Sequence, residues 1–324
     1  MKRKAEEEEL GRLWGDGEDW ERGDLIGEGC FGSVFLAFSK KNKPIVSDRP
    51  PLPPVMAVKS AELSHSESIQ HETEVLSYVK GSAFVIDCLG EEITTSEDGD
   101  QMVYNLLLEF AAGGTLDGLI RRFKGRGLPE SDVISYTRSI LRGLIHIHEC
   151  DYVHCDLKPE NILLVPVANT GRFVAKVADL GLAKRTKEDV GGWRGTPRYT
   201  DPDALMDNVQ NQSSDIWSVG AIVLEMLTGS PPWDVKPGSD LEDFLDMVSQ
   251  EITPKIPPGI SSAANDFLKC CLAINSWERL TAEQLLFHPF IAEPQASEAC
   301  HSSLGYTVVP KIQPPVGLVI TAGL

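Results

Sequence analysis

The stretch from His154 to Leu164, HCDLKPENILL, carries the residues best suited to chemistry. Asp156 is followed by Lys158 two positions later and by Asn161 five positions later, and an apolar strand comes directly after them. An aspartate can accept the proton of a hydroxyl group, a lysine can contact a phosphate, and an asparagine oxygen can bind a metal ion. The spacing predicts one loop that supplies a base, a phosphate contact and a metal ligand.

A second acidic motif, Asp179-Leu180-Gly181, begins 18 residues after Asn161, behind the predicted strand AKVA. Its carboxylate is a suitable ligand for Mg²⁺ that bridges nucleotide phosphates. Chance occurrence of both motifs in this order and spacing is very improbable. The two motifs together predict metal-assisted chemistry on a nucleotide.

Residues 27–34, GEGCFGSV, form a glycine-rich segment. Glycines allow backbone amides to approach phosphate oxygens where a Cβ would intrude. A dinucleotide-binding turn has a similar pattern, but it requires a helix directly after the glycines. The following residues, VFLAF, are strand-like, so we expect a phosphate-covering loop between two strands.

Lys59 ends the apolar run VMAV, and an acidic helical pattern follows it at 67–79. A lysine placed after a glycine loop and before such a helix can hold nucleotide phosphates and pair with a glutamate. Glu72 and Glu74 are both candidates. Glu72 is preferred because its spacing to the apolar pair Val75-Leu76 is the one implied by the family resemblance described below.

The pattern of the chain changes from strand-like to helical near Gly113-Gly114. Strand-like runs and one helix come before this point, and amphipathic helical runs come after it. This order predicts an α+β fold with two lobes. We expect a charged tail at 1–19, one domain at 20–291 (lobes at about 20–111 and 112–291), and a poorly ordered tail at 292–324.

Composition restricts the partners and the compartment. The formal net charge of −18 argues against nucleic acid and anionic membranes as main partners and favours a protein partner. Seven scattered cysteines fit reduced thiols in the cytosol or nucleus, and a metal site at Cys150, His154 and Cys155 lacks a second ligand pair of suitable spacing. No signal peptide and no membrane-spanning run is predicted.

With these motifs, residues 20–291 resemble the eukaryotic protein kinase family. The resemblance implies a serine/threonine kinase that uses ATP and Mg²⁺, with Asp156 and Lys158 catalytic and Asn161 and Asp179 binding metal. It implies that the nucleotide lies between the lobes, with Leu108 as gatekeeper and a hinge at 109–111. The nucleotide contacts it implies are Ile26, Gly27, Glu28, Gly29, Cys30, Phe31, Gly32, Ser33, Val34, Ala57, Lys59, Glu72, Leu108, Glu109, Ala111 and Leu163.

The resemblance also assigns structural roles. Thr196 resembles the threonine that supports the catalytic aspartate, Asp215 the aspartate that steadies the catalytic loop, and Arg279 the arginine that ties down the activation segment. Trp20, HCDLKPENILL, SSDIWSVGAIVLEMLTGSPPWD and ERLTAEQLLFHPFI resemble plant mitogen-activated protein kinase kinase kinases of the MEKK-like group. That likeness implies a signalling cascade with a MAP kinase kinase as substrate.

Three motifs depart from the family pattern. Cys155 replaces the usual arginine, Leu180 the usual phenylalanine, and Asp201-Pro202-Asp203 the usual Ala-Pro-Glu. Leu180 has a suitable size for packing. Asp203 is expected to form an ion pair with Arg279, and the shorter side chain of aspartate is expected to weaken that pair.

Cys155 cannot form the bidentate pair that a guanidinium forms with a phosphate group. Thr186 is the remaining candidate for a regulatory phosphate because Thr196 serves the catalytic loop. We expect basal activity to depend little on phosphorylation of Thr186.

Two other classes of function remain open at this point. A pseudokinase would bind nucleotide or partners without transfer, but such proteins normally lack the lysine or one of the two aspartates, all of which are present. A small-molecule kinase could share the fold, although the helical run after SPPWD and the segment around Thr196 favour a protein substrate. Transfer of label from ATP to a protein, to a metabolite or to neither separates the three.

Overall fold

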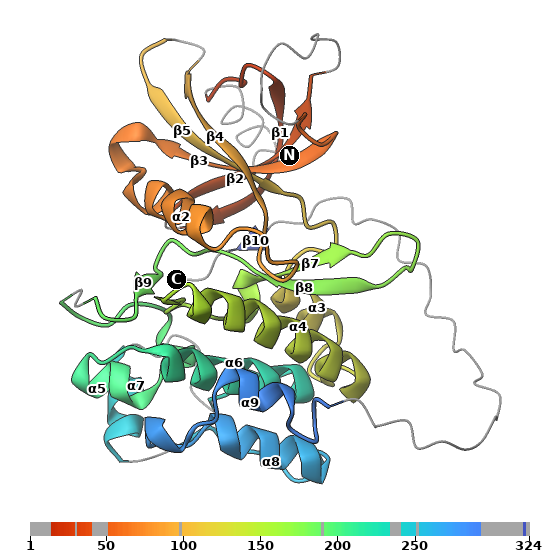
Figure 1. The fold of residues 1–324 in the computed structure, drawn as a ribbon, viewed down its shortest axis with the longest axis vertical. Coiled ribbons are helices and arrows are strands. Elements are labelled where there is room, and N and C mark those ends of the chain that lie inside the picture. Colours follow the sequence, from red (N-terminus) through yellow and green to blue (C-terminus); the bar gives the residue numbers. More distant parts are fainter. Residues whose placement is uncertain are drawn as a thin grey trace.

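The computed structural model describes residues 14–29, 31–40, 51–96, 99–188, 191–233, 241–250, 253–292 and 320–321. The predicted loop residue Cys30, most of the Pro-rich stretch at 41–50, and the tails apart from 14–19, Ala292 and 320–321 lie outside these ranges. The described chain has two lobes: an upper lobe made of a sheet and one helix, and a lower lobe that is mainly helical (Figure 1). The predicted α+β, two-lobed fold is confirmed.

The upper lobe is a sheet of five antiparallel strands in the order β1-β2-β3-β5-β4. A two-residue strand, β10, pairs in parallel with β1. The short turn η1, Leu63–His65, and helix α2, Glu67–Tyr78, follow β3. The strands are β1 Trp20–Gly29, β2 Gly32–Ser39, β3 Val55–Glu62, β4 Cys88–Thr95, β5 Met102–Glu109 and β10 Ile320–Thr321.

Strand β3 divides its side chains between two clusters because alternate residues face opposite sides of a sheet. Met56 and Val58 pack on the outer side with Trp20. Ala57 and Ala61 belong to the main core, which includes the apolar face of α2. Lys59 lies between Ala57 and Ala61 in this alternation, so its side chain is directed toward α2.

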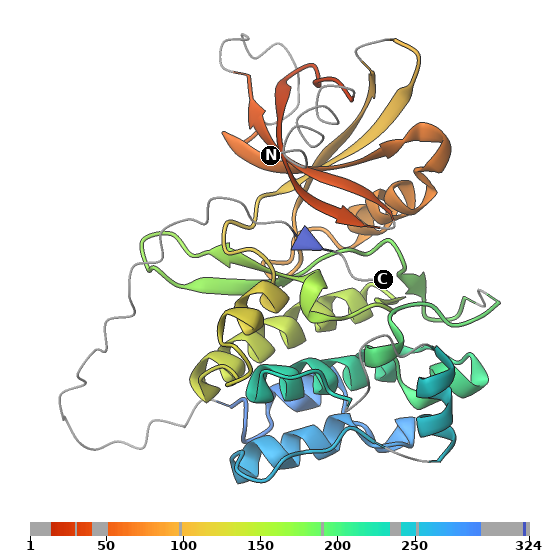
Figure 2. The same cartoon turned by 180° about the vertical axis from the view of Figure 1, so that it is seen from behind.

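The lower lobe is mainly helical, with α4, α6, α8 and α9 packed around the main core (Figure 2). Its helices are α3 Leu116–Arg122, α4 Glu130–Glu149, α5 Pro202–Asp207, α6 Gln212–Thr228, α7 Leu241–Ser249, α8 Ser262–Cys271 and α9 Ala282–Leu286. Its short strands and turns are β6 Tyr152–Val153, β7 Ile162–Pro166, β8 Phe173–Val177, β9 Lys184–Arg185, η2 Pro159–Asn161, η3 Pro197–Tyr199 and η4 Ser276–Glu278.

The hairpin of β7 and β8 lies at the top of the lower lobe, on the side that faces the upper lobe (Figure 2). The backbone N–H of Gly113 donates to Leu164 O at 2.9 Å, and Leu164 N–H donates to Gly114 O at 2.8 Å. A Cβ added to Gly113 would lie 2.7 Å from Leu164 Cβ, so this contact requires glycine. The Gly-Gly pair thus packs closely against β7, in the segment that leads from β5 to α3.

The predicted helices are present, with differences at their ends. The helix-like sequence TAEQLLFHPF at 281–290 forms a helix only as far as Leu286, three residues before Pro289, which has no N–H to donate. Helix α3 was not predicted; its start is marked by Thr115, whose hydroxyl accepts a hydrogen bond from Gly118 N. Within the described residues, no helix is long and apolar enough to cross a membrane.

Candidate active site

Lys59 lies between two carboxylates that come from different parts of the chain. Its Nζ is 2.6 Å from Glu72 Oε2 on α2 and 2.9 Å from Asp179 Oδ1 behind β8. Glu72 is 1% exposed, whereas its rival Glu74 is on the exposed side of the same helix. The structure thus brings together a lysine, a glutamate and an aspartate at the boundary between the lobes.

The positive charge of Lys59 is stabilised by the two carboxylates that lie next to it. Burial lowers the pKa of Lys59, but attraction to Asp179 and Glu72 outweighs burial, so the pKa lies above its usual value. Burial would raise the pKa of Asp179, but Lys59 outweighs that effect and holds the pKa below its usual value. Lys59 is therefore charged and Asp179 is ionised at neutral pH.

The catalytic loop places Asp156 between two side chains. Lys158 Nζ lies 2.9 Å from Asp156 Oδ2, and Thr196 Oγ1 donates to Asp156 Oδ1 at 2.7 Å. Lys158 also donates to Thr196 Oγ1 at 3.0 Å. Because both carboxylate oxygens are held, the Asp156 side chain is fixed beside a cation and a hydroxyl. This arrangement can orient a substrate hydroxyl and receive its proton.

Asn161 is oriented by the same loop. Its Nδ2 donates to Asp156 O at 2.9 Å and to Asp156 Oδ2 at 3.2 Å. Among the described residues, neither Asn161 Oδ1 nor Asp179 Oδ2 accepts a hydrogen bond that would occupy it. Amide and carboxylate oxygens are ligands that Mg²⁺ prefers. The two side chains therefore fit a divalent metal ion.

Asp215, near the start of α6, supports the loop from below. Its carboxylate accepts hydrogen bonds from His154 N at 2.9 Å, Cys155 N at 3.1 Å and His148 Nε2 at 2.9 Å. Cys155 has φ +68°, a left-handed conformation that side chains other than glycine seldom adopt. The Asp215 carboxylate thus compensates a strained backbone just before Asp156.

The ring of His154 is also structural. Asp156 N–H donates to His154 Nδ1 at 3.2 Å, which places the proton on Nε2, and Nε2 lies 3.0 Å from Ala178 O. Both ring nitrogens are engaged, so His154 has no lone pair for a metal shared with Cys150 and Cys155. His154 instead connects the catalytic loop to the residue before Asp179.

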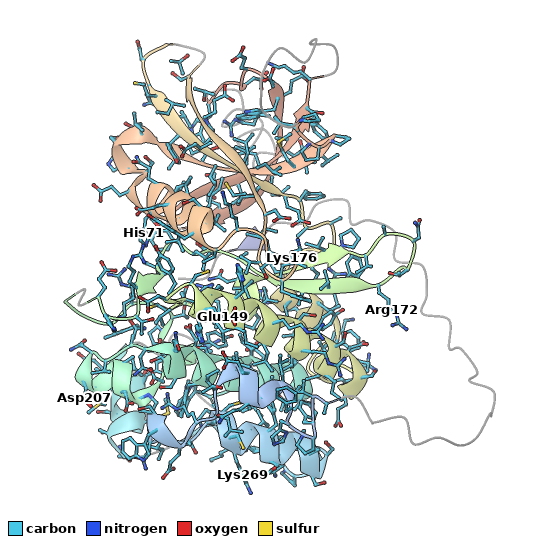
Figure 3. The ribbon with its side chains drawn as sticks, in the orientation of Figure 1. His71, Glu149, Arg172, Lys176, Asp207 and Lys269 are labelled. Atoms are coloured by element: carbon cyan, nitrogen blue, oxygen red, sulfur yellow. The ribbon has the colours of Figure 1, made fainter. Side chains whose placement is uncertain are left out.

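The hinge between the lobes contains one partner that sequence analysis missed. Lys176 on β8, labelled in Figure 3, has its Nζ 2.6 Å from Glu109 Oε2, and it is buried. The backbone N–H of Ala111 donates to no acceptor among the described residues, so it can bind a nucleotide base. Leu108 is 8% exposed and lies opposite Ala57 in the sheet.

The glycine-rich segment is a hairpin, with β1 ending at Gly29 and β2 beginning at Gly32. Gly32 has φ +134°, and a Cβ there would lie 2.5 Å from Ser60 O, so only glycine fits. The apolar residues predicted to contact the nucleotide belong to the main core or pack against it. Ala57 is buried in that core, and Ile26, Val34, Ala111 and Leu163 pack against it while partly exposed.

Arg279 does not pair with Asp203, and that prediction was wrong. Its Nη1 lies 2.8 Å from Asp201 Oδ2, and the two side chains are 0% and 1% exposed. Asp201 is the N-cap of α5, but its side chain caps no helix N–H and is free to face Arg279. Asp203, two residues further on, is partly exposed. The partner of Arg279 is thus the residue before Pro202 and not the residue after it.

Thr186 is placed differently from an accessible phosphate acceptor. Its backbone N–H donates to Asp151 O at 3.0 Å, directly after β9. Its hydroxyl oxygen is buried and has no hydrogen-bond partner in the described part of the chain. In this conformation the hydroxyl is covered, so a kinase could reach it only after the segment moves.

A glycine hairpin, a buried lysine–glutamate pair, a supported aspartate loop and a metal-binding aspartate between two lobes define a phosphotransferase of the protein kinase class. A family model described as protein kinase domain matches residues 20–291, and the chain belongs to that family. Protein kinases use ATP with a divalent metal ion, usually Mg²⁺. The family predicted from the motifs is thereby confirmed.

Similar proteins identify the group of protein kinases that this chain resembles. The chain is 39% identical over 280 residues to mitogen-activated protein kinase kinase kinase 20 of Arabidopsis thaliana, covering 84% of this chain and 78% of that protein. It is 38% identical to mitogen-activated protein kinase kinase kinase 17 of the same plant, covering 84% of this chain and 69% of that protein. It is 37% identical to mitogen-activated protein kinase kinase kinase 18, also of that plant, covering 86% of this chain and 78% of that protein. The chain is a serine/threonine protein kinase similar to this group, and nothing in the site favours a pseudokinase.

Proposed function

We propose that this kinase transfers the γ-phosphoryl group of ATP to a serine or threonine of a MAP kinase kinase. The observation that carries the proposal is the Asp156 carboxylate held between Lys158 and Thr196, beside the Lys59–Glu72–Asp179 group. Such an arrangement positions a hydroxyl and stabilises negative charge on a phosphoryl group.

In this proposal, Asp156 orients the acceptor hydroxyl and takes its proton, while Lys158 contacts the transferred phosphoryl group. Lys59 holds the α- and β-phosphates, and Glu72 keeps the lysine in place. Asn161 and Asp179 bind Mg²⁺, which neutralises phosphate charge. The hinge at Glu109 and Ala111 receives the adenine ring, and Leu108 borders its pocket.

The substrate class rests on the relatives, which are named as MAP kinase kinase kinases and thus act one step above a MAP kinase kinase. A protein of net charge −18 suits a basic segment of such a partner better than nucleic acid. We place this activity in the cytosol, with access to the nucleus, because the scattered cysteines suit a reducing compartment.

The test uses the purified chain, labelled ATP, Mg²⁺ and a panel of catalytically inactive MAP kinase kinases, so that all label comes from this enzyme. Label on serine or threonine of at least one panel member is expected, with none in a Lys59→Met control. Transfer to a generic protein but to no panel member would reject the substrate class. A dominant phosphotyrosine signal, or transfer to no protein at all, would reject the function itself.

A further inference from the structure

The activation segment is residues 179–203, and its described parts, 179–188 and 191–203, are held by contacts that need no phosphate. Cys155, at the position where the family uses a phosphate-binding arginine, is buried, and its Sγ lies 3.6 Å from Val153 O. Burial raises the pKa of this thiol, so it stays uncharged. Some other group must therefore order the segment if the site is to be complete.

The first part of the segment is fixed by aromatic rings. The guanidinium of Arg185 on β9 lies 5.0 Å from the ring centre of Tyr78 and 4.9 Å from that of Tyr152. These rings belong to α2 and β6, so Arg185 joins the segment to both lobes. Nearby, His71 of α2 has its Nε2 2.7 Å from Ala183 O (Figure 3).

The end of the segment is fixed by one glutamine. Gln210 lies between α5 and α6 and is 5% exposed. Its Nε2 donates to Arg194 O at 2.7 Å, and its Oε1 accepts from Arg194 N at 2.9 Å. The side-chain amide thus satisfies both backbone groups of Arg194, as a neighbouring strand would. Asn208 adds a hydrogen bond from Trp193 N to its Oδ1 at 3.2 Å.

The pair of hydrogen bonds between Gln210 and Arg194 is called the clamp below. Arg194 is two residues before Thr196, which contacts the catalytic Asp156. Gly195, next after Arg194, has φ +121°, and a Cβ there would lie 2.4 Å from Cys155 O. Thr196 follows, and its hydroxyl donates to Asp156. Because Gly195 is tightly packed against Cys155 O, a displacement of Arg194 would also displace Thr196, which holds the Asp156 carboxylate.

We propose that Gln210 is a positioning residue, which holds Arg194 so that Thr196 supports Asp156 without a phosphate on the activation segment. The proposal rests on the proposed function and states how that site is kept competent. Gln210 touches neither nucleotide nor acceptor. Its effect must appear in use of the protein acceptor and in order of the segment, and not in nucleotide binding.

The test compares Gln210→Met, which keeps the side-chain length and removes both hydrogen bonds, with Gln212→Met as a matched control. Gln212 also donates to a backbone carbonyl, His148 O at 3.1 Å, but its side chain forms no hydrogen bond with the described residues of the activation segment. A third variant, Gln210→Glu, keeps the acceptor for Arg194 N and loses the donor. All are assayed after phosphatase treatment, with ATP affinity measured by direct titration.

For Gln210→Met, kcat/KM for the protein acceptor is expected to fall by about tenfold or more, equivalent to roughly 1.4 kcal/mol, while the Kd of ATP changes less than about twofold. Gln210→Glu should fall at least as far as Gln210→Met, because its second carboxylate oxygen faces the carbonyl of Arg194 in a buried site, and Gln212→Met should match the unmodified protein. Equal kcat/KM in Gln210→Met and Gln212→Met would overturn the proposal. So would a loss of more than about tenfold on phosphatase treatment of the unmodified protein.

Amide hydrogen exchange of residues 191–199 separates this proposal from the proposed function. Faster exchange is expected in Gln210→Met than in Gln212→Met, whether or not any acceptor is phosphorylated. Unchanged exchange would reject the clamp. If the unmodified protein transfers no phosphate while exchange responds as expected, the clamp holds and the proposed function fails.

Discussion

The hydroxyl of Tyr199 donates a hydrogen bond to Glu225 Oε2 at 2.7 Å, joining the end of the activation segment to helix α6. Glu225 is 7% exposed. Burial of the carboxyl raises the pKa of Glu225 to about 7, and the negative charge of Glu160 adds to this effect. A group with this pKa titrates in the physiological range and links the stability of the lower lobe to pH.

The sign of that dependence follows from proton binding. The folded protein binds the Glu225 proton more tightly than the unfolded chain, whose usual pKa is 4.5. Stability contributed by this group is therefore present at low pH and is lost as pH rises from about 4.5 to about 7. In Glu225→Gln, the free energy of unfolding relative to the unmodified protein should increase over this window, by about 3 kcal/mol at most.

Urea unfolding of both proteins between pH 5 and pH 7.5 measures the difference. A glutamine oxygen can still accept from Tyr199, so the hydrogen bond itself is conserved in the variant. A difference between the two proteins that stays constant with pH would show that Glu225 does not titrate as described.

The moved ion pair gives a second prediction. Asp201→Asn leaves Arg279 buried without its counter-charge, which should lower the free energy of unfolding by about 3 to 5 kcal/mol. Asp203→Asn removes the charge that the family pattern would place in the pair, and it should change stability by about 0.5 kcal/mol or less. Chemical unfolding of the two variants decides between the positions, and a larger loss in Asp203→Asn would contradict the observed pairing.

The group formed by Lys59, Glu72 and Asp179 gives a third prediction. Lys59→Met and Asp179→Asn should each lower the rate of phosphoryl transfer by about 10² or more, because each removes preorganised charge from the nucleotide site. Circular dichroism should show an intact fold in both. Glu74→Gln, on the exposed side of the same helix as Glu72, is the control and should keep normal turnover. Near-normal turnover in either site variant would remove that residue from the nucleotide site.

The covered hydroxyl of Thr186 gives a fourth prediction. Thr186→Val keeps the shape of the side chain and removes a buried hydroxyl that has no partner among the described residues. Stability should be unchanged or slightly higher, since an unsatisfied buried polar group is costly. Turnover should stay within about tenfold of the unmodified protein. A larger loss would mean that Thr186 carries a required phosphate.

Much of the active site could be predicted from local spacing. Asp156, Lys158 and Asn161 lie within six residues, so one loop conformation brings them together whatever surrounds it. The alternation of β3 places Lys59 on the inner face, and the helical period of 67–78 buries Glu72 while exposing Glu74. These relationships depend on backbone geometry that neighbouring residues determine.

Other relationships depended on packing between distant segments. Arg279 meets Asp201 and not Asp203 because Asp201 precedes the first turn of α5 and faces the interior there. Gln210 meets Arg194 for a similar reason, since the path of the chain after α5 returns it to the activation segment. Neither contact has a periodicity that a sequence could reveal. The sequence by itself determined the chemistry of this kinase, whereas the tertiary structure decided which side chains hold that chemistry in place, because those contacts join segments whose separation is set by packing of the whole lobe.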